Sequence, residues 1–379
     1  MVSMKDIAQA CGVSVASVSK ALNNHTDIGE ETRQLIRRTA KEMGYFPNSV
    51  ARTLKTNRSY NLGVLFVDEA NSGLTHDYFA GVLESFKETA ERNDYDITFV
   101  NRNKERRRQM TYLEHARYRG FDGVVIACVD FEDLEVAQLV ASDIPVVTID
   151  HIFNNRIAVM SDNVKGMESL LQFIYSRGHR RIAYIHGHAS SVTGSRLSSF
   201  YKTAEELGLD IPDEYVLEAG YRDTDAAAAA TEELLKLPCP PTCILYPDDF
   251  SCLGGMNMLR EKGLRIPEDI SIAGYDGLRI GRHVEPKLTT LKQDTVKLGS
   301  FAAQKLIGQI ERPKTSEMCI RDRVVWEGGR ELSYYWNDVY DEEDTEDWHE
   351  EKEEKEADWT CLLYTSLWKK EIGTRISEI

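Results

Sequence analysis

The sequence lacks an apolar run long enough to cross a bilayer. None of its hydrophobic stretches approaches the roughly 20 consecutive apolar residues that a membrane helix needs. The opening residues, MVSMKDIAQAC, have no basic segment followed by a continuous apolar one, so they do not resemble a secretory signal. With 379 residues, 42% hydrophobic and 28% charged, the chain is long enough for two or three globular domains. We therefore expect a cytoplasmic protein.

Cysteine is scarce and shows no pairing pattern. The seven cysteines are an odd number scattered along the chain, which is not typical of a disulfide framework. Cys239 and Cys243 lie closest together, but the segment CPPTC has neither the usual zinc spacing nor a second ligand pair. No metal site is predicted.

Motifs of common enzymes are also missing. The best glycine-rich candidate, HGHASSVTG, lacks G-x-G-x-x-G spacing, and no expected strand is followed by an acid placed to hold a ribose. No G-x-S-x-G segment is present for a serine hydrolase nucleophile. The sequence predicts neither an enzyme activity nor a cofactor.

Positive charge is scarce overall and concentrated at the front. The formal net charge is −16, yet residues 1–58 carry nine Lys/Arg against five acids. Residues 316–379 carry 8 basic and 19 acidic groups. Because charge distribution reports on partners, a basic front on an acidic body predicts that the front segment alone contacts a polyanion.

Two short helices are predicted near the N-terminus. Ser3 and Asp6 form a capping-box pattern that opens the first, and Gly12 ends it. Ser14 is placed to cap the second, in which Lys20 points away from the apolar face. The apolar positions are Ile7, Ala8 and Cys11 in the first helix and Val18, Ala21 and Leu22 in the second. Two short helices joined by so brief a turn make a helix-turn-helix, whose second helix can enter a DNA major groove.

A third helix is expected from about Glu30 to Met43. It should bury Leu35, Ile36 and Met43, and Gly44 is a good C-terminal stop. A plain three-helix bundle without a role on DNA would show the same pattern.

The next segment, YFPNSVARTLKTNRS, favours DNA binding over a plain bundle. Asn48 can cap a short helix that carries the cations Arg52 and Lys55. A helix this brief is marginal alone because nucleation costs outweigh so few hydrogen bonds. We expect it to form fully only against a partner surface.

From Leu62 onward, short apolar runs alternate with helical stretches. The runs LGVLFV, ITFV, GVVIAC, VVTI, IAYIHG, TCILY and SIAGY are typical of buried strands. Helices are expected at 78–92, 108–119, 163–177, 196–207, 224–235, 250–262 and 294–310. The alternation predicts an α/β fold with two doubly wound parallel-sheet lobes behind the all-α head. Ligands of such folds bind at the carboxyl ends of the strands, so two facing lobes would border one cleft.

Several segments follow the pattern of a known family in order and spacing. DIAQACGVSVASVSKALN, TRQLI, MGYFPNSVARTLKTNRS and LGVLF, then GHRRIAYIHG and PKLTTLKQDTVKLG, resemble the lactose/galactose repressor family of bacterial transcription factors up to about residue 315. The resemblance implies a homodimer on a near-palindromic double-stranded DNA operator. It also implies a body of periplasmic-binding-protein type, whose closure on a small molecule alters the hinge helices.

The resemblance also implies which residues contact DNA. Base reading would fall on Val15, Ala16 and Lys20, and Leu54 of the hinge helix would wedge into the minor groove. Val15 and Ala16 can offer only apolar contact, for example with a thymine methyl, whereas Lys20 could donate to guanine or reach a phosphate. The full implied set is Ser14, Val15, Ala16, Ser17, Ser19, Lys20, Asn48, Ala51, Arg52, Leu54 and Lys55.

The implied effector contacts lie in the body. They are Tyr78, Phe79, Asp150, Asp162, Asn163, Arg196, Asp249 and Asp276. Carboxylates and amides can bind hydroxyls, Arg offers a planar donor fork, and aromatic rings can cover an apolar sugar face. Structural roles are equally open: Asp162 or Asn163 could cap the following helix, Asp276 could be a turn residue, and Arg196 could pair with an acid. Where the family usually has Asn before the acid of the DDF loop, this chain has Asp248.

The expected organisation has four parts. Residues 1–46 form the helix-turn-helix head, 47–60 the hinge helix and linker, and 61–315 the two-lobed effector-binding and dimerisation domain. In the atypical tail, 316–379, an acidic run predicts disorder, while EMCIRDR and CLLYTS look like translated sequencing-adaptor DNA and suggest that the end is not native. The rival hypothesis is that the acidic tail competes with DNA for the basic head.

The function predicted from these patterns is that of a sequence-specific transcription regulator. We expect a repressor of carbohydrate-utilisation genes whose operator affinity is switched by a small molecule, either a sugar or a purine. The alternative is a solute-binding protein for a sugar or purine, whose front helices serve only for packing.

Overall fold

The computed structural model describes residues 2–23, 25, 27–46, 58–67, 73–101 and 110–312, and the statements on structure below concern these residues. They divide into two units at the Tyr60–Asn61 junction. We call the three helices of the first unit the head and the second unit the body. Five predicted DNA contacts lie outside the described residues, namely Asn48, Ala51, Arg52, Leu54 and Lys55, as does the predicted tail, 316–379.

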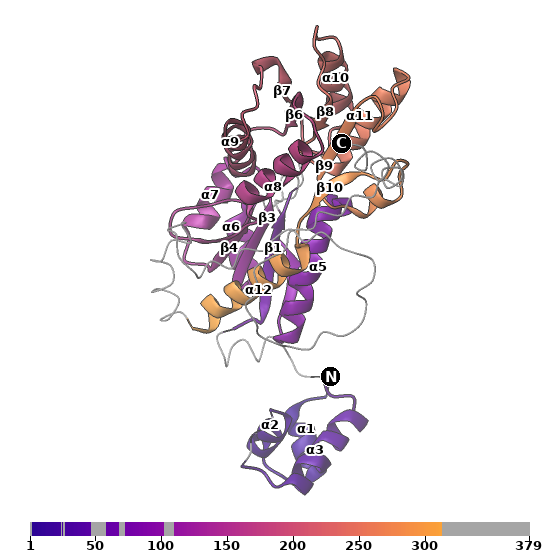
Figure 1. Cartoon of the computed structure of the whole chain (residues 1–379). Helices are drawn as coiled ribbons and strands as arrows, with labels where there is room; N and C mark the ends of the chain where they lie inside the picture. The colour runs from indigo at the N-terminus through magenta and orange to yellow at the C-terminus, as the bar shows by residue number, and fades with distance from the viewer. Residues whose placement is uncertain are drawn as a thin grey trace. The chain divides into compact units, whose positions relative to one another are not determined.

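The head consists of α1 (Met4–Cys11), α2 (Val15–Leu22) and α3 (Glu30–Glu42), labelled in Figure 1. The predicted capping box of Ser3 and Asp6 is confirmed, since each side chain accepts from the other residue's backbone N–H. The predicted cap on α2 is confirmed too, with Ser14 Oγ 3.0 Å from the backbone nitrogen of Ser17. Both short helices therefore begin where the sequence indicated.

The core of the head is small and apolar. Its fully buried side chains are Ile7, Val18, Ala21 and Ile36. The expectation that Leu35 is buried is wrong, because 38% of its surface is exposed. One residue along a helix is a turn of about 100°, so Leu35 points away from the core that Ile36 enters.

The first lobe of the body is built on a five-stranded parallel sheet. Its strands are β1 (Asn61–Phe66), β2 (Asp96–Phe99), β3 (Gly123–Cys128), β4 (Val146–Ile149) and β5 (Ile157–Val159). Their order is β2-β1-β3-β4-β5. Its helices are α5 (Asp77–Arg92), α6 (Tyr112–Arg119) and α7 (Leu134–Ala141), with the short 3-10 helix η1 (Gly73–Thr75).

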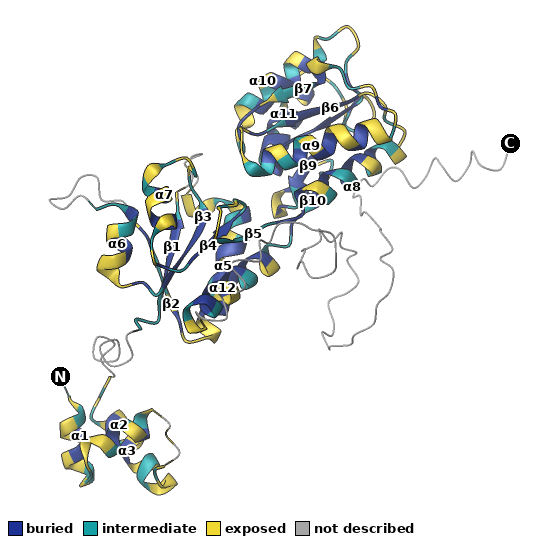
Figure 2. Ribbon diagram, turned by 90° about the vertical axis from the view of Figure 1, so that its left-hand side faces the viewer, coloured by how far each residue is buried: buried dark blue, intermediate teal, exposed yellow. Residues whose placement is uncertain are grey.

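The second lobe repeats this arrangement. Its strands are β6 (Ile182–His186), β7 (Val216–Glu218), β8 (Cys243–Leu245), β9 (Ser271–Asp276) and β10 (Thr289–Lys292), in the parallel order β10-β9-β8-β6-β7. Its helices are α8 (Asn163–Ser176), α9 (Ser191–Glu206), α10 (Thr224–Leu235) and α11 (Asp249–Glu261), with η2 (Asp213–Tyr215) and η3 (Arg279–Arg282). Figure 2 shows the buried strands of each lobe between helices that expose their outer faces. The predicted pair of doubly wound lobes is confirmed.

The last described helix, α12 (Thr295–Glu311), returns to the first lobe and packs along α5 (Figure 1). The close approach of α12 to α5 depends on Gly299, because a Cβ at this position would lie 2.1 Å from the carbonyl oxygen of Val82. Ser85 Oγ also donates to the carbonyl oxygen of Val296 at 2.6 Å. The second lobe is thus followed in sequence by a helix that completes the first.

Some expected elements differ from the observed ones. The helix expected from Arg196 begins at Ser191, because Ser190 caps it by accepting from the Thr193 backbone N–H. The helix expected from Arg108 begins at Tyr112, where Thr111 and Glu114 form a capping box. Four elements, α7, β5, β7 and β10, were not predicted from the sequence. Among the described helices, none is long and apolar enough to span a membrane.

Candidate functional site

Five aspartates stand at the carboxyl ends of strands in the two lobes. Asp150 follows β4 and Asp162 follows β5, while Asp248 and Asp249 follow β8 and Asp276 ends β9. We call these five residues the acidic cluster. The carboxyl edge of a parallel sheet is where ligands of doubly wound folds bind.

The first lobe contributes Asp150 together with aromatic side chains. Tyr78, buried near the start of α5, donates its hydroxyl hydrogen to Asp150 Oδ2 at 2.7 Å. The Phe79 ring lies edge-on to the Tyr78 ring, with 4.9 Å between the ring centres. The ring of Phe66, at the end of β1, has its centre 5.7 Å from that of Phe79. This edge of the first sheet thus combines a carboxylate acceptor with apolar ring faces.

Arg196 of α9 is the buried cation of the second lobe. Its Nε donates to Asn163 Oδ1 at 2.8 Å, and its Nη1 donates to the carbonyl oxygen of Pro247 at 2.9 Å. The guanidinium lies 3.5 Å above the centre of the Tyr275 ring. Among the described residues, no carboxylate forms an ion pair with Arg196, so the predicted alternative of a paired acid is wrong.

Three of the acidic side chains also accept hydrogen bonds that stabilise the fold around them. Asp162 caps α8 by accepting from the Lys165 backbone N–H at 3.0 Å, as one of the two readings of this residue predicted. Asp248 caps α11 through Ser251 and accepts from the Arg222 backbone N–H at 2.7 Å. Asp249 is fully buried, and its two oxygens accept from Leu278 N–H and from Thr290 Oγ1. Both oxygens of Asp249 are therefore held by the protein itself in this conformation, and its contact with an effector stays a prediction.

Asp276 has a turn conformation, and its carboxyl group has a raised pKa. Its φ of 101° lies in the left-handed region, and its Oδ1 accepts from Gln293 Nε2 at 2.7 Å. Burial raises the pKa of Asp276 to about 7; Arg196 opposes the shift, and Asp248 adds to it by repulsion. Burial also raises the pKa of Asp150, against the opposing effects of the Tyr78 hydrogen bond and Arg196. The two acids are therefore coupled to one another and to the same arginine across the lobes.

Several buried polar atoms at this edge make no hydrogen bond of normal geometry among the described residues. They are Asp150 Oδ1, Asp162 Oδ2, Ser161 Oγ, Arg222 Nη1 and the hydroxyls of Tyr184 and Tyr275. A buried polar atom without a partner costs about 1–3 kcal/mol. Such a group of atoms is what a site for a polar ligand requires.

In the head, the predicted reading face of α2 is open. Val15 is 41% exposed, and Ala16 and Lys20 are exposed as well. The Nζ of Lys20 forms an ion pair with Asp27, which follows α2 in the chain. Ser14, Ser17 and Ser19 complete the predicted set in the described region; Ser14 is exposed and Ser17 and Ser19 are half-buried. The face can thus make both apolar and polar contacts.

Comparison with known families matches both parts of the chain. Residues 3–48 match the model described as bacterial regulatory proteins, lacI family, and residues 171–326 match the model of a periplasmic binding protein-like domain. The chain joins a lacI-family DNA-binding domain to a periplasmic binding protein-like domain.

Curated relatives match this protein over nearly its whole described length. It is 29% identical over 335 residues to the probable HTH-type transcriptional repressor ExuR of Bacillus subtilis, covering 86% of this chain and 98% of that one. It is also 29% identical over 329 residues to the HTH-type transcriptional repressor PurR of Escherichia coli (strain SMS-3-5), covering 84% and 94%. Together with the lacI-family match over residues 3–48, these repressors identify the protein as a DNA-binding transcriptional regulator and not as an enzyme.

Solved structures show the same fold. The lac repressor dimer bound to operator and the anti-inducer ONPF matches with a TM-score of 0.69 at 23% identity, covering 82% of this chain and 93% of that one. The transcriptional regulator CelR in complex with cellobiose matches with a TM-score of 0.60 at 23% identity, covering 83% and 94%. The predicted fold class is confirmed.

Several residues at the site were not predicted from the sequence. Arg222 is mostly buried, stacks on the Phe250 ring at 3.9 Å and lies 3.6 Å from Asp77 of the first lobe. Tyr275 lies under Arg196, and the Tyr221 hydroxyl is 2.8 Å from Thr193 Oγ1. No local pattern distinguishes these residues from ordinary loop or core positions. The position of Tyr275 directly before Asp276 at a strand end was the one usable signal.

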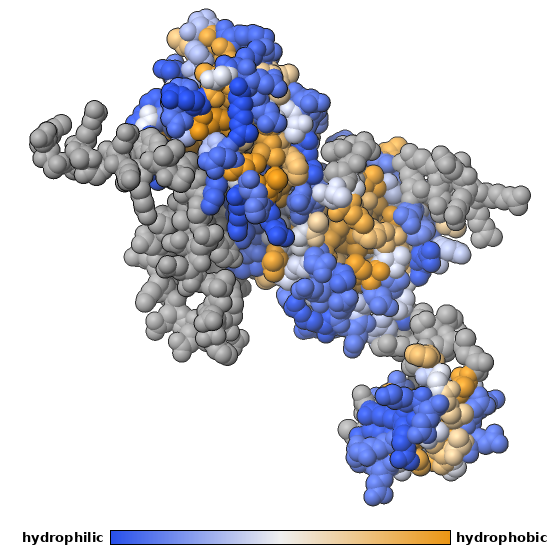
Figure 3. Space-filling model, turned by 90° about the vertical axis from the view of Figure 1, so that its right-hand side faces the viewer, coloured by the Kyte–Doolittle hydropathy of each residue, from blue (hydrophilic) through white to orange (hydrophobic). Residues whose placement is uncertain are grey.

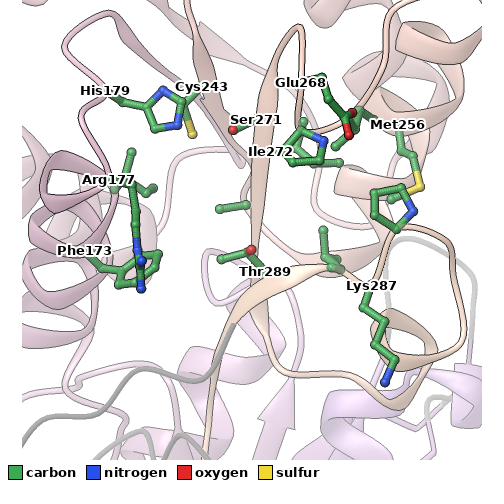
Figure 4. A pocket seen from close by; sticks show the side chains of 16 residues that line it. Phe173, Arg177, His179, Cys243, Met256, Glu268, Ser271, Ile272, Lys287 and Thr289 are labelled. Atoms are coloured by element: carbon green, nitrogen blue, oxygen red, sulfur yellow. The ribbon is translucent and has the colours of Figure 1, made fainter. Parts of the chain in front are cut away.

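A separate cavity lies at the other end of the second sheet. It has a volume of about 270 Å³ and adjoins Cys243, Ser271 and Thr289, the first residues of β8, β9 and β10 (Figure 4). Phe173 of α8 and Arg177, the C-cap of that helix, form one side of it. Because the acidic cluster stands at the opposite ends of the same strands, this cavity is not part of the candidate effector site.

Proposed function

We propose that this protein is a homodimeric repressor that binds a near-palindromic operator through α2. A sugar that binds in the body between the lobes changes the affinity of the protein for this operator. The observation that carries the proposal is the union, in one chain, of an open helix-turn-helix face and a body with unsatisfied buried polar atoms at the carboxyl edges of both sheets. A solute-binding protein would need the second feature only.

The DNA-binding half of the proposal rests on the exposed face of α2. Val15 and Ala16 would give apolar contacts, and Lys20 would donate to a base or a phosphate. The serines Ser14, Ser17 and Ser19 would cap the helix or donate to phosphates. Two heads are required because each reads one half-site, and a dimer supplies them by symmetry. In Figure 3, apolar side chains gather in patches on one face of the body, which supports a subunit interface there.

The effector half rests on Tyr78, Phe79, Asp150, Arg196 and Asp276. Asp162 and Asn163 adjoin this set through Arg196 and the start of α8. Binding would shift the balance between lobe arrangements only through a difference in affinity for them. ExuR and PurR are named as repressors, and CelR is described with cellobiose, so a sugar is the first candidate to test.

A selection of random duplexes by the full-length protein tests the DNA-binding half. Ala16→Glu should abolish enrichment or lower affinity for the selected duplex by about tenfold or more, because it adds a negative charge at the phosphate-facing helix. Gln9→Glu places the same charge on the exposed face of α1 and serves as the matched control. Enrichment of no duplex, or equal losses in both variants, would contradict the proposal.

A further inference from the structure

Arg222 is a cation of the second lobe whose charge is only partly balanced by the protein. Its side chain is 10% exposed, and its guanidinium carbon lies 3.9 Å above the centre of the Phe250 ring. Its Nη1 atom is buried and forms no hydrogen bond among the described residues. Asp77 Oδ2 lies 3.6 Å from this atom, beyond hydrogen-bond distance, and the Asp77 side chain is 52% exposed. A buried donor needs an acceptor, and because this donor is cationic, an anion satisfies it best.

The backbone holds Arg222 at this place independently of its side chain. Its φ of 58° lies in the left-handed region, which a residue other than glycine adopts only where the surrounding structure holds it. Its backbone N–H donates to Asp248 Oδ2 at 2.7 Å, and Asp248 also caps α11, the helix that carries Phe250. The side chain can therefore be changed without removal of the hydrogen bond that positions it.

Arg222 stands beside the residues proposed to contact the effector. Asp77, its partner in the other lobe, directly precedes Tyr78, and the Tyr78 hydroxyl donates to Asp150. Asp248, which accepts from the Arg222 backbone, follows β8 at the carboxyl end of the second sheet. A ligand held at Tyr78 and Asp150 would therefore lie next to the Arg222 side chain.

The acidic cluster does not bar an anion from this region. Burial raises the pKa of Asp150, raises that of Asp276 to about 7, and raises that of Asp249 well above its ordinary value. Each shift favours the uncharged carboxyl group, which can donate a hydrogen bond to an anion. Arg196 adds a second buried cation. The strand ends thus carry less negative charge than their composition suggests.

We infer that the effector carries one anionic group and that Arg222 binds this group in place of Asp77. The ligand class is a monoanionic sugar acid, a uronate or an aldonate, because one buried nitrogen opposite one displaced carboxylate matches a single negative charge. The inference rests on the proposed function, because it assigns the charge of the ligand at the site proposed there. Since Asp77 and Arg222 belong to different lobes, the exchange removes an ion pair between the lobes and so alters the balance between their arrangements.

The first test is a thermal-shift and calorimetric panel on the full-length protein with sugars matched except for charge. Glucuronate, galacturonate and gluconate form the acidic arm; glucose, galactose and sorbitol are their neutral counterparts, and glucose 6-phosphate probes a dianion. At least one sugar acid should raise the melting temperature and bind about tenfold more tightly than its counterpart. Equal binding within each pair, a preference for a neutral member or for glucose 6-phosphate, or no binding by any acid would overturn the inference.

Variants at Arg222 connect the preference to this residue. Arg222→Gln removes the cation and keeps the backbone N–H, so the Kd of the sugar acid should rise about tenfold or more, with no matching rise for the neutral counterpart. Arg222→Lys keeps the charge and should recover part of the loss. Arg260→Gln removes the same charge from the exposed last turn of α11 and is the matched control. An equal rise for both members of a pair, or the same Kd in Arg222→Gln and Arg260→Gln, would assign Arg222 no role in recognising the anion.

Asp77→Asn tests the exchange of one carboxylate for the other. The substitution frees Arg222 Nη1 from its present partner, so the Kd of the sugar acid should fall about two- to fivefold, as for the loss of a partly exposed ion pair. The Kd of a neutral counterpart should not change. A Kd of the acid that stays the same or rises would show that the ligand does not displace Asp77.

Duplex binding is measured separately, so the two proposals fail separately. A protein that selects an operator but binds only neutral sugars keeps its proposed function and loses the charge assignment. A protein that binds a sugar acid through Arg222 but selects no duplex has the reverse result.

Discussion

Arg222 of the second lobe reaches across to the first, where its Nη1 lies 3.6 Å from Asp77 Oδ2 at the start of α5. The arginine is mostly buried while the aspartate is about half exposed. The pair therefore joins the loop before α10 to the helix that carries Tyr78. The two residues belong to the two lobes of the body, whose relative arrangement the proposed effector would shift.

Asp77→Asn should weaken this link without affecting either core. Exposed ion pairs contribute about 0–1 kcal/mol, so effector affinity should change by no more than about fivefold. The change should shrink as salt is raised, because screening weakens the pair in the unmodified protein. Calorimetry at two salt concentrations measures it. A salt-independent change would show that Asp77 acts otherwise than through Arg222.

Asp276→Asn should alter the pH dependence of stability. Because the folded protein raises the pKa of Asp276 from 3.8 to about 7, the folded state binds the extra proton between these values. The stability from this group is full below pH 3.8 and is lost as pH rises towards about 7. The difference in unfolding free energy between the unmodified protein and the variant should therefore decline over that window, by a few kcal/mol at most (about 1.4 kcal/mol per pKa unit). Urea titrations from pH 4 to 8 measure it, and parallel curves would refute the shift.

Asp27→Asn should strengthen DNA binding. In the head, Asp27 holds the ammonium group of Lys20 in an ion pair, so removing the acid frees a cation on the predicted reading face. We expect a two- to fivefold gain in affinity, roughly, and a salt slope steeper by about one. Fluorescence anisotropy with the selected duplex over a salt series gives both values. Glu31→Gln removes the same charge from the exposed start of α3. An equal gain in duplex affinity for this variant would show that the change in net charge, and not the release of Lys20, causes the effect.

The sequence predicted those elements whose signals are local. The head could be placed because Ser3 and Ser14 act through caps a few residues long, and α10 could be bounded at Thr224–Leu235 because Asp223 caps a helix-forming run. Strands β5, β7 and β10 are three or four residues long and half-buried. Because they are so short, their sequences show no alternation of apolar and polar residues from which a strand could be predicted. Their pairing is imposed by neighbouring strands.

The candidate site was predictable only in part for the same reason. Strand ends and helix starts indicated Asp150, Asp162 and Asp276, since carboxyl edges follow from the order of elements. The stacking of Arg196 on Tyr275 and the reach of Arg222 to Asp77 join residues 79 and 145 positions apart. Such contacts are decided by tertiary packing, which no single segment encodes.

Two glycines of α12 should respond in opposite ways to alanine. At Gly299 a Cβ would lie 2.1 Å from the Val82 carbonyl oxygen and 2.7 Å from the Phe86 nitrogen, both backbone atoms of α5. Gly299→Ala should therefore separate the two helices and lower the unfolding free energy by about 1–3 kcal/mol. At Gly308 no atom lies within 4 Å of the added Cβ, so Gly308→Ala should stabilise the same helix by about 0.5–1 kcal/mol through its propensity alone. Chemical denaturation of both variants measures the contrast. Because the substitution and the helix are the same, a gain at both positions would mean that α12 does not pack on α5 as closely as Gly299 requires.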